Sequence, residues 1–183
     1  MHISDLHPDL FYTPGYPVDC TEPVCCRTNV TAKGNSTKKS GHWGSLGKCD
    51  LPIQTFDVFL SEVKKMNLDA IIWTGDNTPH DIWQQSQSYN LNFTIMLAQK
   101  IKQATNATVI AAMGNHESFP VNVYDYSKSS REEVLHGGLA SAWKYWLDDS
   151  ALKMQREKGD YSMVYPHLNN VKVLSMNTQA GND

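Results

Sequence analysis

The segment Ala70-Ile71-Ile72-Trp73-Thr74-Gly75-Asp76-Asn77 decides the fold, because a short apolar run ends abruptly in a glycine and two polar residues. Such a run, bounded by a turn, is typical of a strand buried inside a sheet. The pattern recurs where the run from Thr108 to Met113 ends in Gly114-Asn115-His116-Glu117. A third polar cluster, Asp5-Leu6-His7, follows the first apolar residues of the chain. The sequence therefore predicts three strands that each end in polar side chains.

Amphipathic segments separate and follow these strands. Helical spacing of apolar residues predicts one helix from an N-cap at Asp50, with Pro52 in its first turn, a second over 91–104 and a third over about 131–147. Their expected inner faces carry Phe56, Phe59, Leu60 and Val63; Phe93, Met96, Leu97 and Ile101; and Val134, Leu139, Trp143 and Trp146. Further strands are expected near 161–165 and 171–176, the second one buried. Strands alternating with helices indicate an α/β domain with a substantially parallel sheet.

Composition excludes several classes of protein. The 183 residues are 40% hydrophobic and 19% charged, so the chain can bury a core and intrinsic disorder is not expected. The net charge of −3 argues against a general nucleic-acid-binding surface. A strand that ends only seven residues before Asp183 suggests that the sequence is a piece of a longer protein.

Residues 8–50 form a long irregular segment that contains all four cysteines. A loop of this length inside a domain is expected to need covalent staples. The cysteines allow three disulfide pairings, and a zinc knuckle competes with them although the spacing fits it poorly. Four glycosylation acceptor patterns, which begin at Asn29, Asn35, Asn92 and Asn106, add modest support for a secretory or lysosomal compartment.

The three polar clusters point to a common site. In open α/β sheets, sites form outside the carboxyl ends of the strands, so the clusters are expected to converge. Carboxylate, imidazole and amide oxygen together suit zinc or another first-row divalent ion. Each cluster alone reads as well as a turn or a solvated group, and only their order along the chain favours a metal site.

That order resembles the calcineurin-like metallophosphoesterases, and further motifs resemble the acid sphingomyelinases among them. These motifs are Cys20-Thr-Glu-Pro-Val-Cys25-Cys26-Arg27, Gly41-His-Trp-Gly44, Lys48-Cys49-Asp50-Leu51-Pro52, Trp73-Thr-Gly-Asp76-Asn77-Thr78-Pro79-His80-Asp81 and Gly114-Asn115-His116-Glu117-Ser118-Phe119-Pro120-Val121-Asn122. The resemblance spans nearly all 183 residues. It implies a sandwich of mostly parallel sheet with flanking helices, of which this chain is the amino-terminal part, with 8–50 as a disulfide-stapled insertion.

The resemblance also assigns roles to residues. A first zinc would be bound by Asp5, His7 and Asp76, and a second by Asp76 and the side-chain oxygen of Asn115. The family's three further histidine ligands would lie beyond Asp183, and His42, His136 and His167 are expected to be solvated surface residues. The resemblance further places two non-ligand histidines, His80 and His116, near the leaving group, where the imidazolium form, abundant at acidic pH, would donate a proton. It also pairs the cysteines as Cys20–Cys25 and Cys26–Cys49.

The function that follows from the resemblance is zinc-dependent hydrolysis of sphingomyelin to ceramide and phosphocholine by a metal-activated water. A related phosphodiesterase acting on nucleotides or other small phosphoesters, and a non-catalytic relative, are the alternatives. We expect a lysosomal or secreted protein that reaches a membrane surface through its parent protein and binds no nucleic acid. Residues 1–183 alone are expected to be inactive, because the ligand set would be incomplete.

Overall fold

The centre of the fold is a parallel three-stranded sheet in the order β1-β4-β5. In the computed structural model, which describes residues 1–124 and 129–181, these strands span His2–Ile3, Ala70–Trp73 and Thr108–Ala111. Ile3 lies opposite Trp73 in the register, and Trp73 lies opposite Ala111. All three strands therefore end at the same edge of the sheet, and the predicted parallel arrangement is confirmed.

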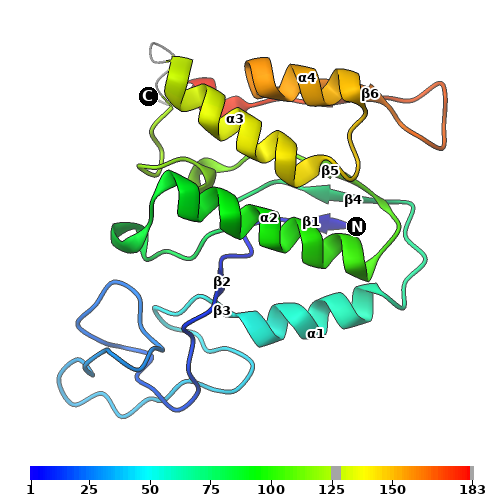
Figure 1. The fold of residues 1–183 in the computed structure, drawn as a ribbon. Coiled ribbons are helices and arrows are strands. Elements are labelled where there is room, and N and C mark those ends of the chain that lie inside the picture. Colours follow the sequence, from blue (N-terminus) through cyan, green and yellow to red (C-terminus); the bar gives the residue numbers. More distant parts are fainter. Residues whose placement is uncertain (125–128, 182–183) are drawn as a thin grey trace.

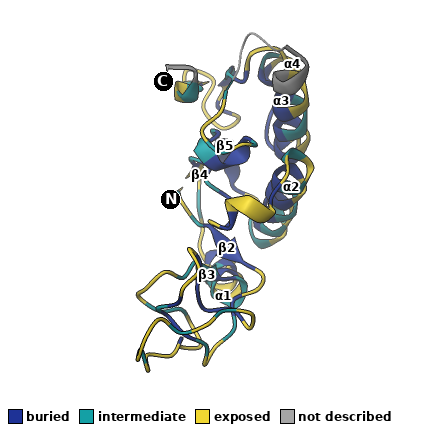
Figure 2. Ribbon diagram, turned by 90° about the vertical axis from the view of Figure 1, so that its left-hand side faces the viewer, coloured by how far each residue is buried: buried dark blue, intermediate teal, exposed yellow. Residues whose placement is uncertain are grey.

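Helices share one hydrophobic core with this sheet. They are α1 (Ile53–Val63), α2 (Gln87–Ala104), α3 (Ser129–Trp143) and α4 (Asp149–Lys158). Figures 1 and 2 show α2, α3 and α4 together on one side of β4 and β5. A Cβ atom on Gly138 would lie 2.5 Å from the Leu91 side chain, so this glycine lets α3 approach α2 closely. Within residues 1–124 and 129–181, no helix is both long and apolar enough to span a bilayer.

The start of α1 differs from the expectation. Asp50 was expected to cap this helix, but the N-cap is Pro52, which makes no side-chain cap hydrogen bond. The Asp50 carboxylate instead accepts hydrogen bonds from the backbone and the ring of His80, which lies thirty residues further along the chain. Asp50 therefore binds His80, a residue distant in sequence, instead of capping the helix that follows it.

The region after the third predicted helix also differs. That helix ends at Trp143, and Val134, expected on its inner face, is 56% exposed. A separate helix, α4, follows. It has Asp148 as its N-cap and ends at Gly159, which adopts the left-handed conformation common at helix ends. Helical spacing alone could not show which side of α3 meets the sheet.

The last two strands form an antiparallel hairpin of β6 (Tyr161–Val164) and β7 (Lys172–Ser175). The expectation of a buried strand over 171–176 is wrong, because Leu174 and Met176 are 68% and 70% exposed. Ser175 is buried, where its hydroxyl donates to the Ala111 carbonyl oxygen. Within the described residues, one face of β7 is therefore packed and the face that carries Leu174 and Met176 is exposed.

The irregular segment lies at one end of the molecule, beyond the short strands β2 (Pro8–Asp9) and β3 (Leu51–Pro52), which pair in parallel (Figures 1 and 2). Two disulfides, Cys20–Cys25 and Cys26–Cys49, staple it with the pairing that the resemblance implied. All four cysteines form disulfide bonds and none is free to bind a metal, so the zinc-knuckle alternative is wrong.

A buried arginine joins this segment to the rest of the fold. Arg27 donates from Nε to Asp9 and from Nη1 to Asp81, both at 2.8 Å, and all three side chains are buried. The guanidinium carbon also lies 5.4 Å from the centre of the Phe11 ring. Asp9 follows the first polar cluster and Asp81 follows the second, so Arg27 ties the segment to both.

Candidate metal centre

The ends of β4 and β5 approach each other through two glycines. A Cβ atom on Gly75 would lie 2.1 Å from the backbone nitrogen of Gly114, so no larger residue fits at this position. The first polar cluster joins the same edge by backbone hydrogen bonds, from Asp5 N to the Gly75 oxygen (3.2 Å) and from His7 N to the Asp76 oxygen (3.3 Å). The three polar clusters therefore converge, as the sequence predicted.

Asp5, His7 and Asp76 form a compact group, in which one potential ligand atom from each lies within 4.8 Å of the others. All three residues have positive φ angles, of 52°, 38° and 56°, in a region of backbone conformation that residues other than glycine rarely adopt. Backbone strain of this kind concentrates at functional sites. His7 Nδ1 donates to the Thr78 carbonyl oxygen at 2.6 Å, which fixes the ring and leaves Nε2 available as a ligand.

Asn115 lies beside Asp76. One atom of its side-chain amide lies 2.9 and 3.1 Å from the two carboxylate oxygens of Asp76, and the other lies 2.8 Å from Asn122 Oδ1. With its nitrogen toward Asp76, the amide donates to both carboxylate oxygens. A half turn of the amide would place its oxygen beside Asp76 instead, and carboxylate, imidazole and amide oxygen are all groups that bind divalent ions.

Glu117, which belongs to the third polar cluster, links it to the second by hydrogen bonds. Its carboxylate accepts backbone hydrogen bonds from Asp76 (3.2 Å), Asn77 (2.9 Å) and Gly114 (2.5 Å). Burial, and then the charge of Asp76, raise the pKa of Glu117 to about 7. The side chain holds the two loops together rather than facing the site.

A second group consists of the three rings of His7, His80 and His116. Their ring centres lie 4.0 Å (His7–His80), 4.7 Å (His7–His116) and 5.0 Å (His80–His116) apart. One ligand atom from each also lies within 4.8 Å of the others, so these histidines are a competing metal-binding group. The two groups share only His7.

The surroundings of His80 and His116 give the two rings different properties. His80 Nδ1 lies 2.6 Å from Asp50 Oδ1, and this hydrogen bond raises the pKa of His80. His116 is buried, and burial together with the charge of His7 lowers its pKa to about 4. Both were expected to be abundant proton donors in mild acid; the structure favours the charged form only for His80.

The remaining histidines considered from the sequence lie outside both groups. His42 is exposed on the irregular segment and His167 is exposed between β6 and β7. His136 was expected at the surface, but it is buried in α3. Among the described residues, neither potential metal-binding group includes any of these three histidines.

Two residues of the site were not assigned roles from the sequence. Asp50 orients His80 through two hydrogen bonds, and Asn122, seven residues after Asn115, contacts the Asn115 amide at 2.8 Å. Both belong to motifs that carry the family resemblance, but neither has a local pattern that reveals its partner. Asp50 was instead interpreted as a helix cap.

Comparisons with known proteins agree with this geometry. The family model described as calcineurin-like phosphoesterase matches residues 1–181. "Sphingomyelin phosphodiesterase A" from Dictyostelium discoideum and "Sphingomyelin phosphodiesterase" from Homo sapiens are each 36% identical over 97% of this chain, covering 29% and 28% of those proteins. "Cyclic GMP-AMP phosphodiesterase SMPDL3A" from Homo sapiens is 29% identical over 97% of this chain and 37% of its own length. This chain thus spans less than a third of the first two relatives, and it belongs to the calcineurin-like phosphoesterase family.

Proposed function

We propose that the protein carrying this chain is a zinc-dependent phosphodiesterase that hydrolyses sphingomyelin to ceramide and phosphocholine. The observation that carries the proposal is the position of Asp76, whose carboxylate has a ligand atom within 4.8 Å of those of Asp5 and His7 and lies in contact with the Asn115 amide. The names of the most similar relatives support the substrate.

The donor set fits two divalent ions that share the Asp76 carboxylate. Asp5 and His7 would bind one ion together with Asp76, with His7 oriented by Thr78. Asn115, whose amide contacts both Asp76 and Asn122, would turn its oxygen toward the other ion. When bound, such ions lower the pKa of a coordinated water toward neutrality and neutralise the charge of a phosphodiester. Zinc is our proposal among the divalent ions, because a histidine–carboxylate set suits it.

Departure of the alcohol requires a proton, and His80 is placed to supply one. Its Nδ1 is engaged by Asp50, which leaves Nε2 free on a ring whose side chain is 51% exposed. His116 lies beside it and is held from the backbone by Asp76 Oδ1 at 3.0 Å. We propose that His80 is the general acid and that His116, a neutral imidazole, contacts the substrate from the buried side.

Two further expectations remain part of the proposal. The two disulfides and the exposed side chains of the four acceptor asparagines support a lysosomal or secreted protein. We propose that residues 1–183 alone hydrolyse no phosphodiester efficiently, because Asp76 has few partners with which to hold two ions. Nucleic acid is not proposed as a partner.

The experiment is reconstitution of the complete protein. After metal removal, zinc is added back and the release of ceramide and phosphocholine from sphingomyelin is measured by mass spectrometry, with Asp76→Asn as the variant. We expect zinc to restore turnover in the wild type, and the variant to lose at least a hundredfold. Hydrolysis of cyclic dinucleotides without sphingomyelin turnover would favour the alternative that the 29% identical relative suggests.

A further inference from the structure

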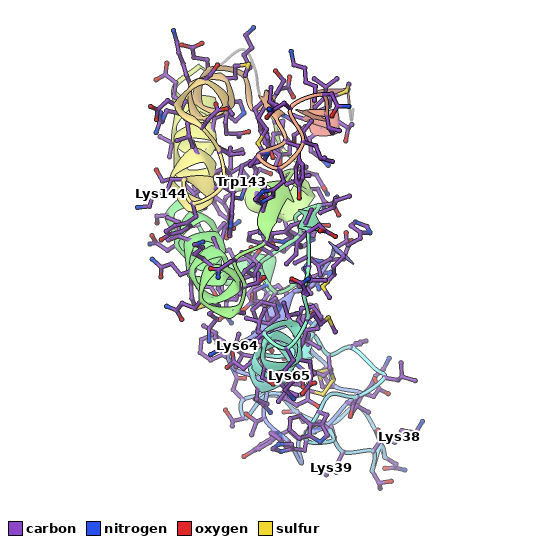
Figure 3. All side chains as sticks on the ribbon, turned by 90° about the vertical axis from the view of Figure 1, so that its right-hand side faces the viewer. Lys38, Lys39, Lys64, Lys65, Trp143 and Lys144 are labelled. Atoms are coloured by element: carbon purple, nitrogen blue, oxygen red, sulfur yellow. A yellow bond between two sulfur atoms is a disulfide. The ribbon has the colours of Figure 1, made fainter. Side chains whose placement is uncertain are left out.

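The irregular segment contains a strongly basic stretch in an otherwise acidic chain. Residues 33–49 include Lys33, Lys38, Lys39 and Lys48 and no aspartate or glutamate. This stretch therefore carries a formal charge of +4, and since the whole chain carries −3, the other residues together carry −7. All four lysines are exposed, and Lys38 and Lys39 project from the end of the molecule formed by this segment (Figure 3).

Two large apolar side chains are displayed on the same stretch. Leu46 is fully exposed and Trp43 is 58% exposed. The backbone beneath them is held in place: Thr55 Oγ1 donates to the Trp43 carbonyl oxygen at 2.9 Å, Gly41 N donates to Ser45 Oγ at 2.7 Å, and Cys49 is disulfide-bonded. Trp43 and Leu46 are three residues apart, so this stretch presents two large apolar side chains together with its lysines. Burying a leucine typically gains about 1.5–3 kcal/mol, which is available to a surface that covers the loop.

Two of these lysines, Lys38 and Lys48, share one hollow with Leu46. A hollow of about 490 Å³ is lined by Lys38, Leu46 and Lys48, with Asp19 as its one acidic residue. Gly44 and Ser45 of the same loop line a second hollow of about 400 Å³ together with Asp5, His7 and His80. The loop from 41 to 48 thus borders both the basic hollow and the hollow at the candidate metal centre.

We infer that residues 33–49 form a docking loop for a lipid bilayer that contains anionic lipids. Lysines at such a surface are attracted by the lipid charge, a tryptophan is stable at the headgroup level, and a leucine inserts among the acyl chains. The inference rests on the proposed function, because it identifies how this chain itself brings a membrane phosphodiester beside its metal centre. It assigns membrane contact to this domain, independently of any other part of the protein.

Asn35 also lines the basic hollow, so its glycosylation bears on the proposed docking loop. Asn35 is one of the four acceptor asparagines, and a glycan there would cover Lys38 and Leu46. The form of the protein that binds vesicles should therefore lack a glycan on Asn35. A glycan on Asn35 in most of the vesicle-bound molecules would overturn the inference.

The test measures binding of the complete protein to vesicles by sedimentation. Vesicles of phosphatidylcholine are compared with vesicles that contain 30% phosphatidylserine, for the wild type and for Lys38→Gln with Lys48→Gln. At about 1 kcal/mol for each lysine, we expect about 30-fold weaker partitioning of the variant onto the anionic vesicles. The matched control neutralises Lys64 and Lys65, two exposed lysines at the end of α1 (Figure 3), and should leave partitioning unchanged.

The apolar contribution is tested in the same way. Leu46→Ser should weaken partitioning about tenfold, whereas Met66→Ser, at another exposed apolar residue, should not. Equal binding to both kinds of vesicle, or unchanged binding of the lysine variant, would overturn the inference. So would a lower melting temperature of Leu46→Ser with unchanged vesicle binding, because another part of the protein would then cover the loop.

Turnover of a soluble diester, bis(nitrophenyl) phosphate, separates this inference from the proposed function. We expect equal turnover in the wild type and in the docking-loop variants, while hydrolysis of vesicular sphingomyelin falls with binding. A wild type that binds vesicles but hydrolyses neither substrate would refute the proposed function and leave the docking loop standing. Unchanged hydrolysis of vesicular sphingomyelin in the lysine variant would refute the docking loop.

Discussion

Replacement of Arg27 by methionine should destabilise the complete protein by about 3–5 kcal/mol, the cost of breaking a buried ion pair by removing one partner. The structure gives this estimate its basis, because the guanidinium lies 2.8 Å from both Asp9 and Asp81 and is buried with them. Methionine keeps much of the volume but leaves two buried carboxylates without their counter-charge. The matched control is Lys65→Met, which breaks an exposed pair with Glu62 and should cost at most about 1 kcal/mol.

The assay is urea unfolding followed by tryptophan fluorescence, at several pH values. Burial raises the pKa of Asp9, and without the arginine this rise is no longer opposed by the hydrogen bond and charge of Arg27. The sign follows from this shift: the folded state then binds protons more readily, so the stability lost at pH 7 is regained as the pH falls toward about 4. A loss below about 1 kcal/mol at pH 7, or a loss that grows in acid, would refute the reasoning.

Three further predictions concern the site and its staple. Asp50→Asn should lower the pKa of His80, as measured by NMR titration of the metal-free protein. Because the pKa of His80 is raised in the folded state, its charged form stabilises the fold below the unfolded pKa, and this stabilisation is lost as the pH rises through the folded pKa. The variant should therefore also be less stable in mild acid, and an unchanged titration would contradict the assigned contact. His116→Gln should keep the zinc content and lower turnover, by metal analysis and kinetics, and loss of zinc would instead make His116 a ligand. Replacing both Cys26 and Cys49 by serine should cost about 3 kcal/mol in urea unfolding, because the bond closes a long loop, and an unchanged midpoint would show that the loop is ordered without it.

The parallel sheet and the convergence of its strand ends could be predicted because both follow from local patterns. Apolar runs that stop at Gly75 and Gly114 mark strand ends, and parallel strands bring their carboxyl ends to one edge. The helices α1 and α2 were predicted from apolar spacing within a few residues. These features depend on short stretches of chain, so local sequence patterns are enough to predict them.

What could not be predicted depends on partners far apart in the chain. Nothing near Asp50 shows that His80 is its partner, and a helix cap was the better local interpretation. Val134 has the spacing of a buried residue, yet the orientation of α3 exposes it. The disulfide pairing came from the resemblance, since four cysteines in an irregular segment allow three pairings on physical grounds.

Asp5, His7, Asp76 and Asn115 form the proposed metal centre. Anomalous X-ray scattering at the zinc edge, from crystals of the complete protein grown with zinc, tests it most directly. We predict an ion bound by Asp5, His7 and Asp76 and a second on the Asn115 side of Asp76, with the His80–Asp50 contact intact. An ion held instead by His7, His80 and His116 would contradict the claim.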